Sequence, residues 1–127
     1  MAFLGMAECN AKGDVNVSKF KDRIAGCGGF INITQNTHKV VFCGTFTAKG
    51  LREEIRDGKL VITHEGAVQK FIDKVGQITF SAEYAHKHNQ QVMFITERCV
   101  FVLTDKGLVL TEIAPGVDLQ KDILDQM

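Results

Sequence analysis

The segment Gly26-Cys27-Gly28-Gly29 holds the residues best suited to chemistry in this sequence. Glycine has no side chain, so three glycines in four residues let the backbone adopt positive φ and approach a ligand closely. The spacing matches neither the dinucleotide-binding fingerprint nor the phosphate loop with its Lys and Ser or Thr. On its own the segment is also compatible with a tight turn between a strand and a helix.

Cysteine and histidine are the other candidate reactive groups. Cys27, inside the glycine segment, is the candidate nucleophile of a small hydrolase in which a histidine is the base. The four cysteines are scattered without a CxxC pair, and a chain of 127 residues can build a core without disulfides. We therefore expect four free thiols and no metal site, and we expect His86-Lys87-His88 to lie in a solvated loop. The cysteines are Cys9, Cys27, Cys43 and Cys99.

A short helix and a buried strand are expected directly after the glycine segment. Residues 30–36 suit one or two helical turns before Lys39. Val40-Val41-Phe42-Cys43 is a continuous apolar run rich in β-branched residues, which is typical of a strand buried on both faces. The same pattern predicts a second buried strand at residues 92–95.

Turn residues divide the rest of the chain into short strands. Strand-like residues 1–7, a polar turn at residues 10–14 and a returning strand at residues 15–17 predict a hairpin. From residue 51 onward, tight turns separate short apolar runs, so we expect mostly antiparallel strands there. The alternation at residues 77–80 predicts one half-buried strand. The tight turns are Asp57-Gly58, Glu65-Gly66 and Lys106-Gly107.

A helix is expected at the carboxyl terminus. Pro115 and Gly116 stop a strand, and Asp118 is placed to cap a helix that carries Leu119 and Ile123 on one face. The chain begins in a strand-like segment and ends in this helix without a terminator. We therefore expect residues 1–127 to be a single α/β domain whose two ends are boundaries imposed on a longer polypeptide.

The composition excludes several classes of partner. Fifteen basic and fifteen acidic residues leave no net charge, so no long-range field attracts nucleic acid or an anionic membrane surface. No apolar run approaches the roughly 20 residues that span a bilayer, and the amino terminus lacks the features of a signal peptide. We expect a cytoplasmic protein that holds any anionic ligand through local contacts.

An ordered set of segments, rather than a single motif, resembles a known family. The set is similar to the carboxy-terminal, β-type half of family I coenzyme A transferases and covers essentially the whole chain. The resemblance implies a strand-rich portion of the open α/β fold that these enzymes share. The segments are residues 2–8, Gly13-Asp14-Val15-Asn16, the glycine segment, residues 39–43, Thr96-Glu97-Arg98-Cys99-Val100-Phe101 and residues 112–118.

The resemblance implies the acyl-CoA-binding part of an enzyme that moves coenzyme A between a short-chain acyl-CoA and a carboxylic acid, as in the metabolism of short-chain fatty acids and ketone bodies. In this family a glutamate carries first the acyl group and then CoA as a thioester. That glutamate precedes the Ala-Phe-Leu-Gly strand, so we expect it to come from a missing amino-terminal part of the same enzyme. The implied substrates are acyl-CoA and a carboxylic acid. No covalently bound cofactor is implied, and a homo-oligomer is left open.

The resemblance also assigns roles to residues of the glycine segment. The amide of Gly28 or Gly29 would donate to the oxyanion that forms when the thioester carbonyl is attacked. Gly26 and Phe30 would shape the acyl pocket. Asn32 and Gln35 would lie where the next helical turn holds or buttresses the pocket. Two positions depart from many relatives, because aspartate is common in place of Asn32 and glycine is common in place of Lys49.

No glutamate of the chain stands in the sequence context of the family's nucleophile. We expect no catalytic residue here and an isolated chain that does not transfer CoA. Glu97-Arg98 matches a family segment, but an adjacent acid and base at a strand turn usually form a structural ion pair. The other glutamates considered lie at a strand end, in a charged surface stretch, in a turn and near the final helix: Glu8, Glu53, Glu54, Glu65 and Glu112.

Two other functions are compatible with the sequence. The first is the small hydrolase with Cys27 as nucleophile, for which fast alkylation of one thiol with loss of activity would be the signature. The second is a non-catalytic interaction module that pairs through exposed strand edges. Binding of CoA or acyl-CoA would count against the interaction module.

Overall fold

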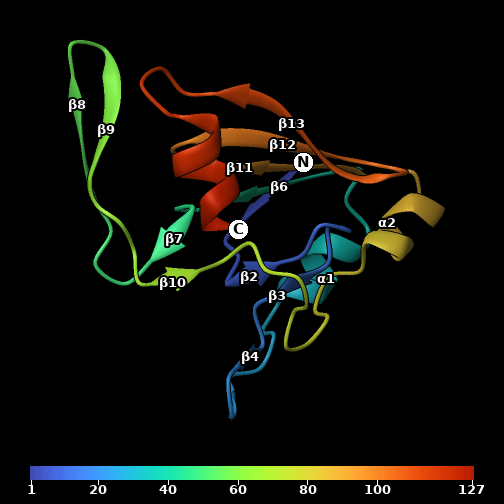
Figure 1. The fold of residues 1–127 in the computed structure, drawn as a ribbon. Helices are drawn as coiled ribbons and strands as arrows, with labels where there is room; N and C mark the ends of the chain where they lie inside the picture. The colour runs from blue at the N-terminus through green and yellow to red at the C-terminus, as the bar shows by residue number, and fades with distance from the viewer.

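A computed structural model describes all residues 1–127 and shows a strand-rich α/β fold around one five-stranded sheet (Figure 1). Strands β1, β6 and β11 are parallel, and β12 and β13 continue the sheet in antiparallel pairing. The fold class predicted from the sequence is confirmed. The sheet has the order β1 (Ala2–Leu4), β6 (Lys39–Cys43), β11 (Gln91–Ile95), β12 (Cys99–Thr104) and β13 (Gly107–Ile113).

Two short helices lie in the connections between the parallel strands. Helix α1 (Phe30–Gln35) precedes β6, as predicted, and helix α2 (Ala82–Lys87) precedes β11. The prediction of a loop at residues 86–88 is wrong, because α2 includes His86 and Lys87. This helix begins at Ser81, whose hydroxyl oxygen accepts a hydrogen bond from the Tyr84 N–H, so a polar stretch is helical because it is capped.

Four two-stranded sheets surround the main sheet. Two of these hairpins, β4–β5 and β8–β9, project from the body of the molecule (Figure 1). The hairpin predicted near the amino terminus is confirmed for β2 and β3, but β1 leaves it and pairs with β6 instead. The pairs are β2 (Glu8–Cys9) with β3 (Val15–Asn16), β4 (Lys19–Phe20) with β5 (Arg23–Ile24), β7 (Thr47–Ala48) with β10 (Val68–Gln69), and β8 (Arg52–Arg56) with β9 (Lys59–His64).

Phenylalanine side chains form the centre of the core. The ring of Phe42 on β6 packs against Phe30, Phe80 and Phe94, with ring centroids 5.9, 5.1 and 5.0 Å apart. Residues 40–42 are buried as predicted, whereas Cys43 is exposed because the strand ends there. In β11 only alternate side chains are fully buried, so the predicted strand is confirmed but it is buried less completely than β6.

The prediction of a strand at residues 77–80 is wrong. Only Phe80 forms a bridge, with Val15, and Ile78 is 57 % exposed. The Thr79 and Phe80 N–H groups both donate to the Val15 carbonyl oxygen, which is incompatible with a regular ladder. The alternation of apolar side chains over four residues is therefore produced by an irregular segment.

The carboxy-terminal helix is confirmed, with its predicted cap. The Asp118 carboxylate accepts from the Lys121 N–H at 2.7 Å, and a π-helical turn, η1 (Leu119–Ile123), leads into a 3₁₀ turn, η2 (Leu124–Gln126). Ile123 is completely buried, but Leu119, in the first turn, is exposed to solvent, so the two side chains are not buried together. None of the helices has both the length and the apolar character needed to cross a bilayer.

Candidate functional site

The glycine segment lies at the carboxyl edge of the parallel strands. Strands β1, β6 and β11 share one direction, so Leu4, Cys43 and Ile95 end at the same edge of the sheet. Helix α1 runs back from this edge to the amino end of β6, which places the residues before α1 at the edge. In open α/β sheets, ligands bind in the crevice outside the carboxyl ends of the strands.

Backbone conformation, not crowding, explains why glycine occupies this segment. Gly26 and Gly28 have φ of 82° and 53°, in the left-handed region that glycine adopts without strain. A Cβ added at either residue would have no atom within 4 Å, so the surrounding space is open. Gly29 has φ of −83° and directly precedes α1.

Two N–H groups of the segment are unoccupied. The Ala25 and Gly26 N–H groups donate to the Ser18 carbonyl oxygen at 2.8 and 3.2 Å, which holds the start of the segment against the β4–β5 hairpin. The N–H groups of Gly28 and Gly29 donate to no acceptor of the chain, and both residues are exposed. Free, adjacent backbone donors of this kind are suited to binding an oxyanion.

Phe30, Asn32 and Gln35, which the resemblance also assigns to the pocket, lie on helix α1. Phe30 is buried and stacks on Phe42, so it anchors the end of the glycine segment to the core. Asn32 and Gln35 are exposed on α1, and neither side chain makes a hydrogen bond to the glycine segment. Sequence reasoning missed Gln90, whose amide donates to the carbonyl oxygens of Thr34 and Thr37 at 2.6 and 2.7 Å and so fixes the end of α1.

Cys27 is not arranged as a catalytic cysteine. Its thiol packs partly against the core and has only a weak hydrogen bond, 3.7 Å, to the Gly28 carbonyl oxygen. No histidine is hydrogen-bonded to it, so the nucleophile and base pairing of a cysteine hydrolase is missing. All four cysteines carry free thiols.

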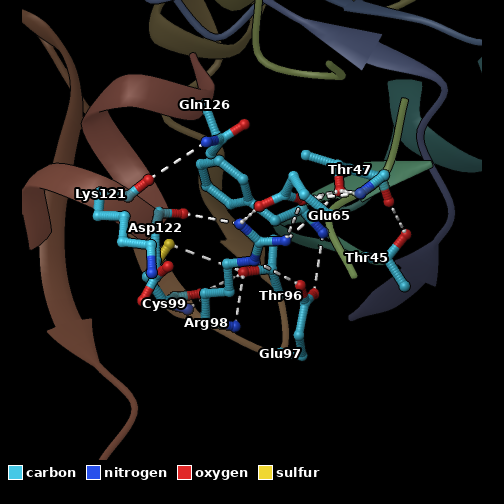
Figure 2. A network of polar contacts seen from close by, with 12 residues as sticks. Thr45, Thr47, Glu65, Thr96, Glu97, Arg98, Cys99, Lys121, Asp122 and Gln126 are labelled. Carbon is cyan, nitrogen blue, oxygen red and sulfur yellow. Dashed lines mark hydrogen bonds and ion pairs between the residues drawn. The ribbon is translucent and has the colours of Figure 1, made fainter. Parts of the chain in front are cut away.

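Arg98 is the centre of a buried polar network at the same edge (Figure 2). Its side chain is completely buried. Its two terminal nitrogens donate to both carboxylate oxygens of Glu65 at 2.8 and 2.6 Å, and Nε donates to Glu97 at 2.9 Å. The Asp122 carbonyl oxygen accepts from the same guanidinium, and the Phe46 N–H donates to the second oxygen of Glu97. The predicted ion pair of Glu97 and Arg98 is confirmed.

This network leaves neither carboxylate free to act as a nucleophile. Burial by itself raises the pKa of Glu65, but hydrogen bonds from Arg98, Thr47 and Gly66 outweigh it and lower the pKa to about 2. The charge of Glu65 is therefore strongly stabilised, and its oxygens are all occupied. The oxygens of Glu97 are likewise bound by Arg98 and by the Phe46 N–H.

Three of the other glutamates are engaged in contacts of their own. One oxygen of Glu8 accepts from the Asn16 side chain and from the Gly76 N–H at 2.7 and 2.6 Å. Glu54 pairs with Arg56 in the β8–β9 hairpin, and Glu83 pairs with Lys87 along α2. No group of three or more His, Cys, Asp and Glu side chains is placed to bind a metal ion.

A groove of about 620 Å³ is lined by residues of three separate parts of the chain. It lies between the residues that follow β1, the β4–β5 hairpin and the β7–β10 pair. Four lysines line the groove, but they come from three separate segments of the sequence, so no single sequence motif predicts that they lie together. The lining residues are Met6, Ala7, Glu8, Val17, Lys19, Phe20, Lys21, Ala48, Lys49, Val68, Gln69 and Lys70.

Comparison with curated proteins finds relatives that match the whole chain. It is 53 % identical over its full length to the caffeate CoA-transferase of Acetobacterium woodii and to the acetate CoA-transferase YdiF of Escherichia coli strain K12. The chain spans about a quarter of the length of these relatives. No family model matches the sequence.

Solved structures give the same result. Two crystal structures of the acyl-CoA transferase YdiF from Escherichia coli O157:H7, one the apoenzyme and one a thioester complex with CoA, match with a TM-score of 0.96 and 54 % identity. Each match covers 98 % of this chain and 24 % of the enzyme. A variant of the decarboxylase AibA/AibB shares the fold alone, with a TM-score of 0.54 and 16 % identity over 91 % of this chain and 45 % of its own.

Proposed function

Because this chain belongs to the family I coenzyme A transferases, we propose that it is the carboxy-terminal, acyl-CoA-binding part of an enzyme that moves CoA between a short-chain acyl-CoA and a carboxylic acid. One observation carries the proposal: the N–H groups of Gly28 and Gly29 are free and exposed at the carboxyl edge of the sheet. The chain spans about a quarter of its relatives, so the activity of the complete protein is part of this proposal.

In the proposed reaction, the chain stabilises charge and does not supply the attacking group. A glutamate carboxylate attacks the thioester carbonyl, and the carbonyl oxygen becomes an oxyanion that accepts hydrogen bonds from Gly28 or Gly29. Collapse of this intermediate breaks the carbon–sulfur bond, releases CoA thiolate and leaves an acyl-glutamyl anhydride. The thiolate then attacks the glutamyl carbonyl, which releases the donor carboxylate and forms the glutamyl-CoA thioester.

The second half of the reaction runs the same steps in reverse with the acceptor acid. Its carboxylate attacks the glutamyl-CoA thioester, and the returning thiolate forms the new acyl-CoA and frees the glutamate. Gly28 or Gly29 would serve the intermediates that form at the acyl carbon of the substrate, and one such donor contributes about 10²-fold or more to the rate.

The attacking glutamate is proposed to come from an amino-terminal part of the same enzyme. The engaged oxygens of Glu65 and Glu97 support this, because a nucleophile needs a free carboxylate oxygen. A cytoplasmic location stays a prediction from the sequence, which leaves a homo-oligomer open.

A chimaera tests the proposal. This chain replaces the matching quarter of YdiF, and CoA transfer from acetyl-CoA to a short-chain acid is measured. We expect the chimaera to fold and to transfer CoA. We expect the separate chain of 127 residues not to transfer CoA. A chimaera that has the size and the far-UV spectrum of YdiF but no transfer activity would contradict the proposal.

A further inference from the structure

We propose that Ser18 is a positioning residue that fixes the backbone leading into Gly28 and Gly29. Its hydroxyl group is held in turn by the side chains of Gln77 and Thr79. This inference rests on the proposed function, which makes the N–H group of Gly28 or Gly29 the oxyanion donor. It adds residues that do not touch the substrate and that act through the geometry of the glycine segment.

The glycine segment is anchored at its two ends only. At its start, the Ala25 and Gly26 N–H groups donate to the Ser18 carbonyl oxygen at 2.8 and 3.2 Å. At its end, the ring of Phe30 stacks on Phe42 in the core. Between these anchors, the free N–H groups have no acceptor in the chain. The direction in which they point is therefore set by the two anchors, of which Ser18 is one.

The main chain of Ser18 is itself held by a buried amide. Ser18 is only 7 % exposed, and its N–H group donates to the side-chain oxygen of Asn16 at 3.0 Å. Asn16 is completely buried, and its amide nitrogen donates to Glu8 and to the Lys19 carbonyl oxygen, each at 2.7 Å. A buried polar network in which every group has its partners is rigid. The peptide groups on both sides of Ser18 are therefore fixed.

The hydroxyl of Ser18 lies in a chain of hydrogen bonds that runs in one direction. Its oxygen is 2.7 Å from Oε1 of Gln77 and 2.7 Å from Oγ1 of Thr79. A hydroxyl has one proton and Oε1 can only accept, so Ser18 donates to Gln77 and Thr79 donates to Ser18. The Thr79 oxygen then accepts from the Val17 N–H at 3.1 Å. Hydrogen bonds linked in this way strengthen one another.

The irregular segment that carries Gln77 and Thr79 is a firm support. Its Gly76 N–H donates to the carboxylate of Glu8 at 2.6 Å. The N–H groups of residues 79 and 80 donate to the Val15 carbonyl oxygen in β3 at 2.9 and 3.0 Å. The ring of Phe80 packs against Phe42, with centroids 5.1 Å apart. Residues 76–80 therefore connect Ser18 to β3 and to the core.

Positioning of this kind acts on the transition state. An oxyanion donor contributes only when it is aimed at the oxygen on which charge develops. Releasing Ser18 would let the N–H groups of Gly28 and Gly29 move away from that oxygen, while the surfaces that bind acyl-CoA stay the same. The loss of an interaction made only in the transition state lowers kcat and leaves KM unchanged.

Matched variants of the chimaera test the inference. Thr79→Val removes the hydroxyl and keeps the shape of the side chain, whereas Thr79→Ser keeps the hydroxyl. We expect kcat per site that forms the glutamyl-CoA thioester to fall about tenfold in Thr79→Val, because a misplaced donor loses part of its effect of about 10²-fold. KM for acetyl-CoA should not change. Ser18→Ala and Gln77→Met should also lower kcat, and Thr79→Ser should keep the parent value.

Thr104→Val is the control for the loss of a threonine hydroxyl. The Thr104 hydroxyl also donates and accepts, with the Gly107 carbonyl oxygen at 2.8 Å and the Lys106 N–H at 3.2 Å. It lies at the end of β12, at the opposite edge of the sheet, because β12 is antiparallel to β11. Its substitution should leave kcat unchanged.

Hydrogen–deuterium exchange of the same chimaera variants gives a second readout. Thr79→Val and Gln77→Met should speed exchange in peptides that contain residues 25 and 26, whose N–H groups are bound by Ser18. Exchange in β6 and β11 should stay slow. A merely structural role of Thr79 would instead speed exchange in all of these segments, because it would lower the stability of the whole fold.

Several results would overturn the inference. They are an unchanged kcat in both Thr79→Val and Gln77→Met, an equal loss in Thr104→Val, a change confined to KM, and a Thr79→Ser variant as slow as Thr79→Val. If Thr79→Val does not fold, Gln77→Met decides the question, because Gln77 is exposed. A chimaera without transfer activity would refute the proposed function. Unchanged exchange at residues 25 and 26 in the variants would refute the role of Ser18 in either case.

Discussion

The guanidinium of Arg98 holds both carboxylate oxygens of Glu65, at N–O distances of 2.6 and 2.8 Å (Figure 2). Glu65 follows β9, Arg98 precedes β12, and the Asp122 carbonyl oxygen that also accepts from Arg98 is in η1. One buried side chain thus joins three segments that are far apart in the sequence. The segments after β6, β9 and β11 meet at this network, beside the edge where we place the site.

Replacing Arg98 with methionine should destabilise the fold strongly. The substitution keeps an unbranched apolar stem but leaves the carboxylates of Glu65 and Glu97 without their cation, and breaking a buried pair from one side costs about 3–5 kcal/mol. The free energy of unfolding in urea measures the loss. Lys87→Ala breaks the exposed pair with Glu83 and is the control, for which we expect almost no loss of stability. Equal losses in the two variants would show that the Arg98 network is not structural.

Stability should fall in acid because of Glu65. Its pKa is about 2 in the folded chain, whereas an unperturbed glutamate has a pKa of about 4.3. As the pH falls, the unfolded chain binds this proton first, so the stabilisation is complete above about pH 5 and is lost as the pH approaches 2. Urea unfolding at a series of pH values measures it. Glu65→Gln should flatten this part of the profile, and an unchanged slope in that variant would refute the assignment.

The four thiols should react at two different rates. Burial raises the pKa of Cys9 to about 12 and that of Cys99 to about 11, so both remain protonated and shielded in the folded chain. Cys43 is exposed and Cys27 is partly exposed. Titration with a thiol reagent should therefore find two accessible thiols in the native chain and four after denaturation. A total of two after denaturation would reveal a disulfide.

Valine at the glycine segment should reduce CoA transfer by the chimaera. Gly29→Val does not strain the backbone, since φ of Gly29 is −83°, and its side chain would lie where a substrate approaches the free N–H groups. We expect a loss of about 10²-fold in rate for Gly29→Val or Gly28→Val, the usual effect of losing one oxyanion donor. Steady-state kinetics measures it.

Gly58→Val is the matched control for backbone strain. Gly58 has φ of 73° and open space around it, as Gly28 does, but it is at the tip of the β8–β9 hairpin. Its substitution should leave the rate unchanged. Equal rates in the control and in both glycine-segment variants would remove this segment from the acyl site.

The strands and turns of this chain are predictable where local sequence decides them. The apolar run at residues 40–43 forms β6, as expected. The Asp57-Gly58 turn forms the β8–β9 hairpin, as expected, because Asp57 and Gly58 are residues that adopt the positive φ of 52° and 73° that the turn requires. Helix α2 was missed because its stability comes from the Ser81 cap and from packing of Ala82 and Ala85 rather than from a long apolar pattern.

The candidate site was only partly accessible to sequence reasoning. The glycine segment is continuous in sequence and could be found directly. The lysine groove could not, because Lys19, Lys49 and Lys70 converge only after β1, β6 and the small hairpins are arranged at one edge. Asn32 and Gln35 show the opposite case, since their closeness in sequence to the glycines does not bring their side chains to the segment.

Locating the glutamate that attacks the thioester is the most direct test of the proposed function. The chimaera is incubated with acetyl-CoA, the glutamyl-CoA thioester is trapped, and the modified glutamate is located by peptide mass spectrometry. We predict that the thioester maps to the part contributed by YdiF and that the separate chain of 127 residues gains no mass from CoA. A thioester on any glutamate of this chain, such as Glu8 or Glu97, would contradict the account.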